Sequence, residues 1–157
     1  MSPTTLALLV VAGPWVAGSL VMRRRLTWLL TGLSLVPVVA LTLVPVDRRA
    51  FERCDVQWAF PTPGRVELMA NLVLFVPPVL LAGVATRRPL LVLLVAGGAS
   101  AGLEAVQAAV PALGRSCDTT DWLCNTLGAL VGAVLVALTL HLTRDRWAPP
   151  LPAARAR

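Results

Sequence analysis

Five long apolar stretches dominate this 157-residue chain and restrict the folds open to it. Each has 19 to 23 residues, close to the roughly 20 that a helix needs to cross about 30 Å of hydrocarbon. Charged residues make up only 14 % of the chain and gather between these stretches. We therefore predict an all-α, polytopic membrane protein, a bundle of five transmembrane helices at Thr4–Met22, Leu26–Val46, Leu68–Thr86, Pro89–Pro111 and Trp122–Leu142.

Pro14 interrupts the first stretch and leaves a second topology open. If this stretch enters the membrane and returns on the same side, only four spans remain. Proline is tolerated within transmembrane helices, so we favour five spans.

The placement of arginine predicts the orientation of the bundle, because cytoplasmic loops carry an excess of basic residues. The chain has no lysine, and nine of its 14 arginines fall at positions 23–25, 87–88 and 144–157. We therefore expect the N-terminus outside, the C-terminus in the cytoplasm, and a disordered cytoplasmic tail at 143–157. Because the arginines cap apolar segments, the net charge of +6 does not indicate a nucleic-acid partner.

Hydrophilic side chains interrupt the last three stretches near their outer ends. A carboxylate near the middle of an apolar helix costs on the order of 3 kcal/mol on insertion scales, so Glu104 marks a candidate functional site. At 1.5 Å per residue, Glu104 lies roughly 10 Å below the end of its helix, and Asn71 and Asn125 lie roughly 6 Å below theirs. We therefore predict an outward-facing, ligand-binding pocket built from Asn71, Ser100, Glu104, Gln107, Arg115, Asp118, Asp121 and Asn125.

Helical spacing supports this grouping. Ser100, Glu104 and Gln107 are spaced i, i+4, i+7 and share one helix face. A second face carries Asp121, Asn125, Gly128 and Gly132. The two glycines form a G-x-x-x-G pattern, which lets a neighbouring helix approach closely, so we expect them to pack helices together.

Each charged residue also has a purely structural interpretation. Asp118 and Asp121 flank the start of the fifth helix and can cap it. Glu104 can be a structural charge satisfied by Asn71, Asn125 or Gln107. Arg115 can pair with a carboxylate or present its guanidinium to an anionic ligand. These alternatives stay open at this point.

The cysteines and the histidine do not predict a metal site. There are three cysteines and one histidine, and no C-x-x-C pattern is present. Cys54 and Cys117 fall in the two outer loops, where an oxidising exterior permits a disulfide between them; two free thiols are the alternative. No sequence motif for a nucleotide or other cofactor is present, and we expect none.

The chain resembles the VanZ-like family of small bacterial membrane proteins. Three motifs carry the likeness: Asn71-x-x-x-Phe75-x-Pro77; Ser100-x-x-x-Glu104-x-x-Gln107; and Arg115-x-x-Asp118-x-x-Asp121-x-x-x-Asn125-x-x-Gly128. They cover residues 67–140, and the first two stretches carry no signature. One departure is that Val79 follows Pro77-Pro78, where such proteins often have Pro-x-Gly. The resemblance predicts a three-helix VanZ-like domain at 67–142, preceded by two helices and an outer loop at 1–66.

The family takes its name from a protein linked to resistance to the glycopeptide teicoplanin, so the resemblance implies an envelope protein of the bacterial cytoplasmic (inner) membrane with a similar role. Its expected partners are the lipid bilayer and an amphiphilic envelope ligand, such as a lipid-linked wall precursor or a lipoglycopeptide, bound without catalysis. One alternative is an intramembrane enzyme that uses Glu104 or Asp121 as acid or base on a lipid-linked substrate. Another is a small proton-linked transporter or accessory subunit.

Overall fold

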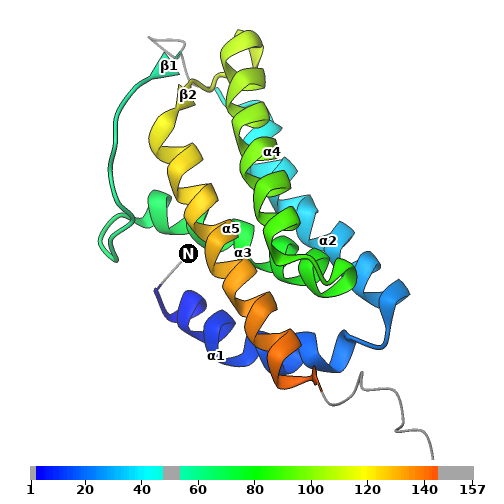
Figure 1. The fold of residues 1–157 in the computed structure, drawn as a ribbon. Helices are drawn as coiled ribbons and strands as arrows, with labels where there is room; N and C mark the ends of the chain where they lie inside the picture. Colours follow the sequence, from blue (N-terminus) through cyan, green and yellow to red (C-terminus); the bar gives the residue numbers. More distant parts are fainter. Residues whose placement is uncertain (1–2, 48–53, 145–157) are drawn as a thin grey trace, which may run out of the picture.

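The computed structural model describes residues 3–47 and 54–144. All five apolar stretches are helices, with bounds within three residues of those predicted: α1 (Pro3–Leu20), α2 (Arg24–Leu43), α3 (Val66–Thr86), α4 (Pro89–Ala109) and α5 (Thr119–Leu142) (Figure 1). Each is long and apolar enough to cross a membrane. Pro14 lies inside α1, which runs through it unbroken. Most of the predicted tail, from residue 145 onward, lies outside the described residues.

Helices α3 and α5 form the centre of the bundle because glycines let them approach closely. A Cβ atom on Gly128 would overlap the backbone carbonyl oxygen of Leu72. A Cβ on Gly132 would lie 2.9 Å from the Cβ of Val79. Both glycines named in the sequence analysis therefore lie where the two helices meet, and neither site has room for a side chain.

The other three helices surround this central pair. Helix α4 packs against α5 and α3, α2 packs against α3, and α1 packs against both α3 and α5. Only 17 % of the most apolar window of α2 and 11 % of that of α4 is buried, against 61 % for α3. The outer helices thus present apolar side chains such as Leu94 to their surroundings, as expected of helices in contact with a lipid bilayer.

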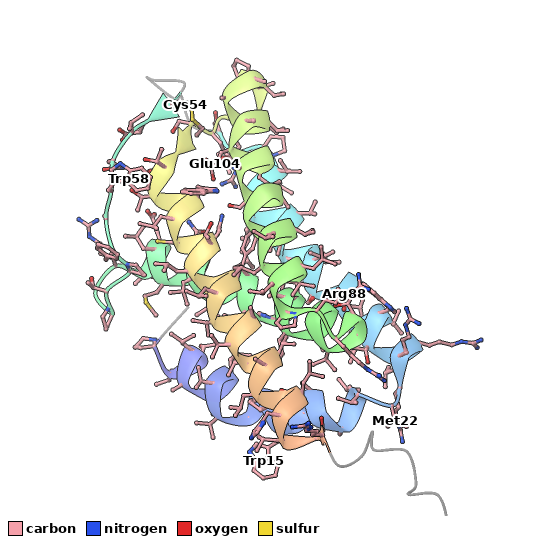
Figure 2. The ribbon with its side chains drawn as sticks, in the orientation of Figure 1. Trp15, Met22, Cys54, Trp58, Arg88 and Glu104 are labelled. Atoms are coloured by element: carbon pink, nitrogen blue, oxygen red, sulfur yellow. A yellow bond between two sulfur atoms is a disulfide. The ribbon has the colours of Figure 1, made fainter. Side chains whose placement is uncertain are left out.

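The two ends of the bundle are built differently. At one end, short turns join α1 to α2 and α3 to α4, and Arg87 closes α3 in the left-handed conformation (φ 58°), its N–H donating to the carbonyl of Gly83. We call this the arginine end. The other end, which we call the strand end, holds β1 (Cys54–Asp55), β2 (Cys117–Asp118) and the 3-10 helix η1 (Pro111–Leu113). Figure 2 shows Cys54 and Glu104 at the strand end, and Met22 and Arg88 toward the other.

The two short strands pair in parallel, with Cys54 opposite Cys117 and Asp55 opposite Asp118. From β1, residues 54–65 run beside the first turns of α5 to the start of α3 (Figure 1). We call residues 54–65 the strap. The strap places a loop from the first half of the chain against the start of α5, and a candidate site forms where the two meet.

Candidate functional site

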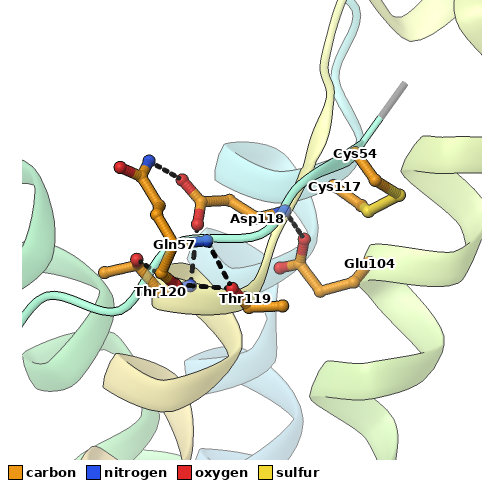
Figure 3. Close-up of a disulfide and its surroundings, with 7 residues drawn as sticks. All are labelled: Cys54, Gln57, Glu104, Cys117, Asp118, Thr119 and Thr120. Carbon is orange, nitrogen blue, oxygen red and sulfur yellow. Dashed lines mark hydrogen bonds between the residues drawn. A yellow bond between two sulfur atoms is a disulfide. The ribbon is translucent and has the colours of Figure 1, made fainter. Parts of the chain in front are cut away.

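A disulfide and a set of hydrogen bonds hold the strap against the start of α5 (Figure 3). Cys54 and Cys117 form the disulfide, with their Cα atoms 4.5 Å apart. The N–H of Gln57 donates to Thr119 Oγ1 (3.0 Å), and its carbonyl accepts from Thr119 Oγ1 (2.5 Å) and Thr120 Oγ1 (2.9 Å). The strap therefore extends the pairing begun by β1 and β2, with threonine hydroxyls as partners.

Asp118 caps α5 and also binds the strap. Its Oδ1 accepts the N–H of Thr120 at 2.7 Å, which confirms the capping interpretation of this residue. Its Oδ2 accepts from Gln57 Nε2 at 2.9 Å. Because each carboxylate oxygen accepts a hydrogen bond from within the protein, Asp118 fixes the shape of the site.

The carboxylate of Glu104 supports the same strand from the other side. Its Oε2 accepts the backbone N–H of Asp118 at 2.8 Å. The sequence suggested Asn71, Asn125 or Gln107 as structural partners of Glu104, and this hydrogen bond instead goes to a backbone group of β2. A charged acceptor for a backbone N–H is among the stronger protein hydrogen bonds, so Glu104 ties α4 firmly to β2.

The polar face predicted on α4 is shared among three neighbours. Ser100 Oγ accepts from Asn125 Nδ2 at 2.9 Å, which joins α4 to α5. Gln107 Nε2 donates to the carbonyl of Thr42 at 2.9 Å, which joins α4 to the end of α2. Together with the hydrogen bond from Glu104 to β2, this face joins α4 to three elements: α5, α2 and β2. Asn125 Oδ1 is buried and has no hydrogen-bond partner among the described residues.

Arg115 lies on the α2 side of the strand end. Its Nε donates to the carbonyl of Val44 at 3.3 Å, and nearby the N–H of Val46 donates to the carbonyl of Leu113 at 3.0 Å. These bonds close the end of α2 onto the segment between α4 and β2. Arg115 is near enough to Asp121 for their opposite charges to attract.

A cleft of about 490 Å³ lies between the strap and the first turns of α3 and α5. It is lined by Gln57, Ala59, Gly64, Arg65, Val66, Glu67, Leu68, Asp118, Thr120 and Asp121. The lining combines charges of both signs with amide, hydroxyl and aliphatic groups. This composition suits a molecule that is partly polar and partly apolar.

Asp121, like Asp118, is a predicted site residue that lines the cleft. The side chain of Asn71 on α3 lies close to its carboxylate. Glu67 and Asp118 bring further negative charge to its surroundings. Thus Asp118 and Asp121 line the cleft and Asn71 reaches it through Asp121. Ser100, Glu104, Gln107, Arg115 and Asn125 do not line it, and join the surrounding elements instead.

Four cleft residues do not stand out in the sequence: Gln57, Arg65, Glu67 and Thr120. Arg65 and Glu67 read as ordinary charges at the edge of an apolar stretch, and Gln57 is one polar residue in a long loop. Thr120 follows a capping residue, which is a weak signal. These four residues come together only in the folded structure, where the strap lies beside the starts of α3 and α5.

Two further features bear on the chemistry of the site. Within residues 3–47 and 54–144, no group of three or more His, Cys, Asp or Glu side chains is arranged to hold a metal ion. Cys124, one turn into α5, is buried as a free thiol. The polar groups that line the cleft are carboxylates, an amide, a hydroxyl and a guanidinium.

A second hollow is of a different kind. It is an apolar groove of about 360 Å³ between α1 and α3, whose lining includes Leu8, Val16 and Leu81. It offers almost no hydrogen-bonding groups, so it is suited to acyl chains or another helix and not to a polar headgroup.

Comparison with known proteins identifies the family. A family model described as VanZ/LLP1 matches residues 6–140. The chain belongs to the VanZ/LLP1 family. The VanZ-like resemblance is thereby confirmed, and the match also takes in α1 and α2, where the sequence motifs gave no sign of it. Comparison of this VanZ/LLP1 family protein with curated proteins and with solved structures returned no match.

Proposed function

We propose that this VanZ/LLP1 family protein is a multi-pass protein of the bacterial cytoplasmic membrane that binds an amphiphilic envelope molecule. The ligand class is a lipid-linked wall precursor or a lipoglycopeptide, and its headgroup occupies the cleft beneath the strap. The protein binds this molecule without altering it, and thereby changes the response of the cell to glycopeptide antibiotics such as teicoplanin.

The cleft is the observation that carries this proposal. A polar hollow at the end of a bundle of apolar helices lets a headgroup bind protein while its lipid chain stays in the bilayer. Arg65 can pair with a phosphate or carboxylate, and Glu67 and Asp121 can accept from hydroxyl, amide or amino groups. Leu68 and Val66 supply apolar contacts at the same cleft.

The proposal needs the strand end to face outward. Two features support that orientation. The Cys54–Cys117 disulfide belongs in an oxidising compartment. The turns at the other end hold Arg23 to Arg25 together with Arg87 and Arg88, as cytoplasmic loops do.

The residues that do not line the cleft act in this scheme as positioning residues. Glu104, Gln107 and Arg115 tie α4, β2 and the end of α2 together, and so hold the framework to which the strap is attached. Their substitution should therefore alter binding by loosening the cleft, in contrast to the direct loss expected on substituting Glu67 or Arg65.

The test compares charged residues inside and outside the cleft. Glu67→Gln and Arg65→Ala change exposed cleft residues; Asp47→Asn and Arg88→Ala change exposed residues elsewhere. Each variant is expressed in a glycopeptide-sensitive bacterium, and the purified proteins are assayed for binding of a fluorescent lipid-linked wall precursor in nanodiscs. We expect both cleft variants to lose resistance and precursor binding, and both controls to retain them.

Equal susceptibility and equal binding across all four variants would contradict the proposal. Conversion of the precursor to a new product would identify an enzyme instead. Uptake of the probe driven by a proton gradient would identify a transporter.

A further inference from the structure

The strap has two distinct sides along its extended part. In an extended chain successive side chains point in opposite directions. Gln57 and Ala59 line the cleft, whereas Val56, Trp58 and Phe60 are 75 %, 62 % and 73 % exposed. One side of the strap therefore faces the protein, and the other presents three large apolar side chains to the surroundings.

This outer side has a composition unusual for a loop in water. Residues 56–64 include no charged side chain, and the nearest charges, Asp55 and Arg65, lie at either end of them. Contiguous exposed apolar side chains generally mark a surface that contacts something. Tryptophan and other aromatic side chains are enriched where a membrane protein meets the headgroup region of the bilayer.

The strap is packed against the start of α5 through Trp58. The rings of Trp58 and Trp122 meet edge to face, with centroids 6.4 Å apart. Trp122 belongs to the first turn of α5, and its Nε1 donates to the carbonyl of Gly97 on α4 at 3.2 Å. Trp58 is thus held beside the end of an apolar helix (Figure 2).

The strand end also exposes apolar side chains outside the strap. Val106 and Val110, at the end of α4, are 43 % and 41 % exposed. The outer side of the strap therefore belongs to an end of the bundle that presents apolar side chains on more than one element.

We propose that the outer side of the strap is a membrane-binding surface, with Val56, Trp58 and Phe60 inserted among the lipids of the outer leaflet at the boundary between headgroups and acyl chains. The occupant of this surface is the bilayer itself. The strap thereby anchors the strand end in the interface and makes the cleft open toward lipid headgroups. This inference does not depend on which ligand the cleft binds, or on whether it binds one.

Site-directed spin labelling tests the proposal in the intact protein. Cys124 is replaced by alanine, the Cys54–Cys117 disulfide is kept, and single labels are placed at positions 56, 60, 94 and 47 in separate variants. Position 94 is an exposed apolar control on α4, and position 47 is an exposed control in the loop that follows α2. The protein is reconstituted in nanodiscs of phosphatidylethanolamine and phosphatidylglycerol, and the label is exposed to oxygen, which concentrates in lipid, or to a water-soluble nickel complex.

We expect labels at 56 and 60 to be relaxed severalfold more by oxygen than by the nickel complex, as at 94, with the reverse at 47. Nickel accessibility at 56 and 60 equal to that at 47 would overturn the proposal, because the strap would then lie in water. Protection from both reagents would also overturn it, because a protein surface would cover the strap. An intact disulfide, measured by the lack of thiol alkylation, verifies that each label leaves the strap attached.

Discussion

The centre of the bundle and its strand end are held together by different forces. Between α3 and α5 the contact depends on close packing. Gly128 and Gly132 have no side chains, so the two helix backbones can approach each other closely. At the strand end the contact depends on directional bonds. A disulfide and hydrogen bonds that involve Gln57, Asp118 and Glu104 hold the strap in place. The first region gives the protein its fold, and the second shapes a cleft on that fold. Substitutions should therefore separate the two properties.

The largest effect is expected at the centre. Gly128→Val would drive a side chain into the carbonyl group of Leu72, a backbone atom that cannot move aside by changing rotamer. We expect destabilisation on the order of 5 kcal/mol, seen as loss of the monodisperse protein in detergent and a collapse of its melting temperature. Gly102→Ala on α4 is the control, since nothing lies within 4 Å of the added atom. An unchanged melting temperature for Gly128→Val would show that the close approach of α3 and α5 does not determine the stability of the bundle.

Removing the disulfide should affect mainly the strand end. The bond joins residues 63 positions apart, so the double substitution Cys54→Ser, Cys117→Ser should cost about 4 kcal/mol. Hydrogen exchange should accelerate over residues 54–65 and 117–121, with little change in the middle of α3. Equal acceleration in both regions would show that the strand end and the centre unfold as one unit.

Glu104 allows a finer test of the strand end. Glu104→Ala leaves the N–H of Asp118 without its acceptor and should cost about 1–2 kcal/mol, whereas Glu104→Gln keeps an oxygen acceptor and should cost less. Hydrogen exchange at the amide of Asp118 measures both. If the two variants behave alike, charge and not this hydrogen bond is what Glu104 contributes.

The smallest effect is expected at Gln57. Gln57→Ala removes the bond from Nε2 to Asp118 and leaves the backbone bonds to Thr119 and Thr120 in place. A loss of about 0.5–1 kcal/mol is expected, measured as local exchange in the strap. A loss as large as that from removing the disulfide would contradict this ranking.

The sequence predicted the helices well because their signal is local. Apolar runs of membrane-spanning length separated by arginines specify five helices without tertiary information, and the G-x-x-x-G pattern at Gly128 and Gly132 indicated a packing face. Asp118 was correctly recognised as a possible cap, because capping depends on neighbouring residues. Each of these inferences uses only a few consecutive turns of chain.

The cleft was harder to predict because it depends on a contact between distant segments. Depth along separate helices predicted that polar residues of the last three helices would meet, but could not tell that Ser100, Glu104 and Gln107 would turn to three different neighbours. Gln57 and Arg65 enter the site because the strap pairs with β2, and Glu67 enters it because α3 packs against α5; no local pattern encodes either long-range contact.

Photocrosslinking of the ligand tests the central claim most directly. A lipid-linked wall precursor carrying a photoreactive group on its headgroup is irradiated with the wild-type protein in nanodiscs, and the modified peptides are identified by mass spectrometry. The account predicts modification within residues 57–68 and 118–121, lost on adding excess unlabelled precursor. Crosslinks confined to the apolar groove between α1 and α3, or none that unlabelled precursor displaces, would contradict it.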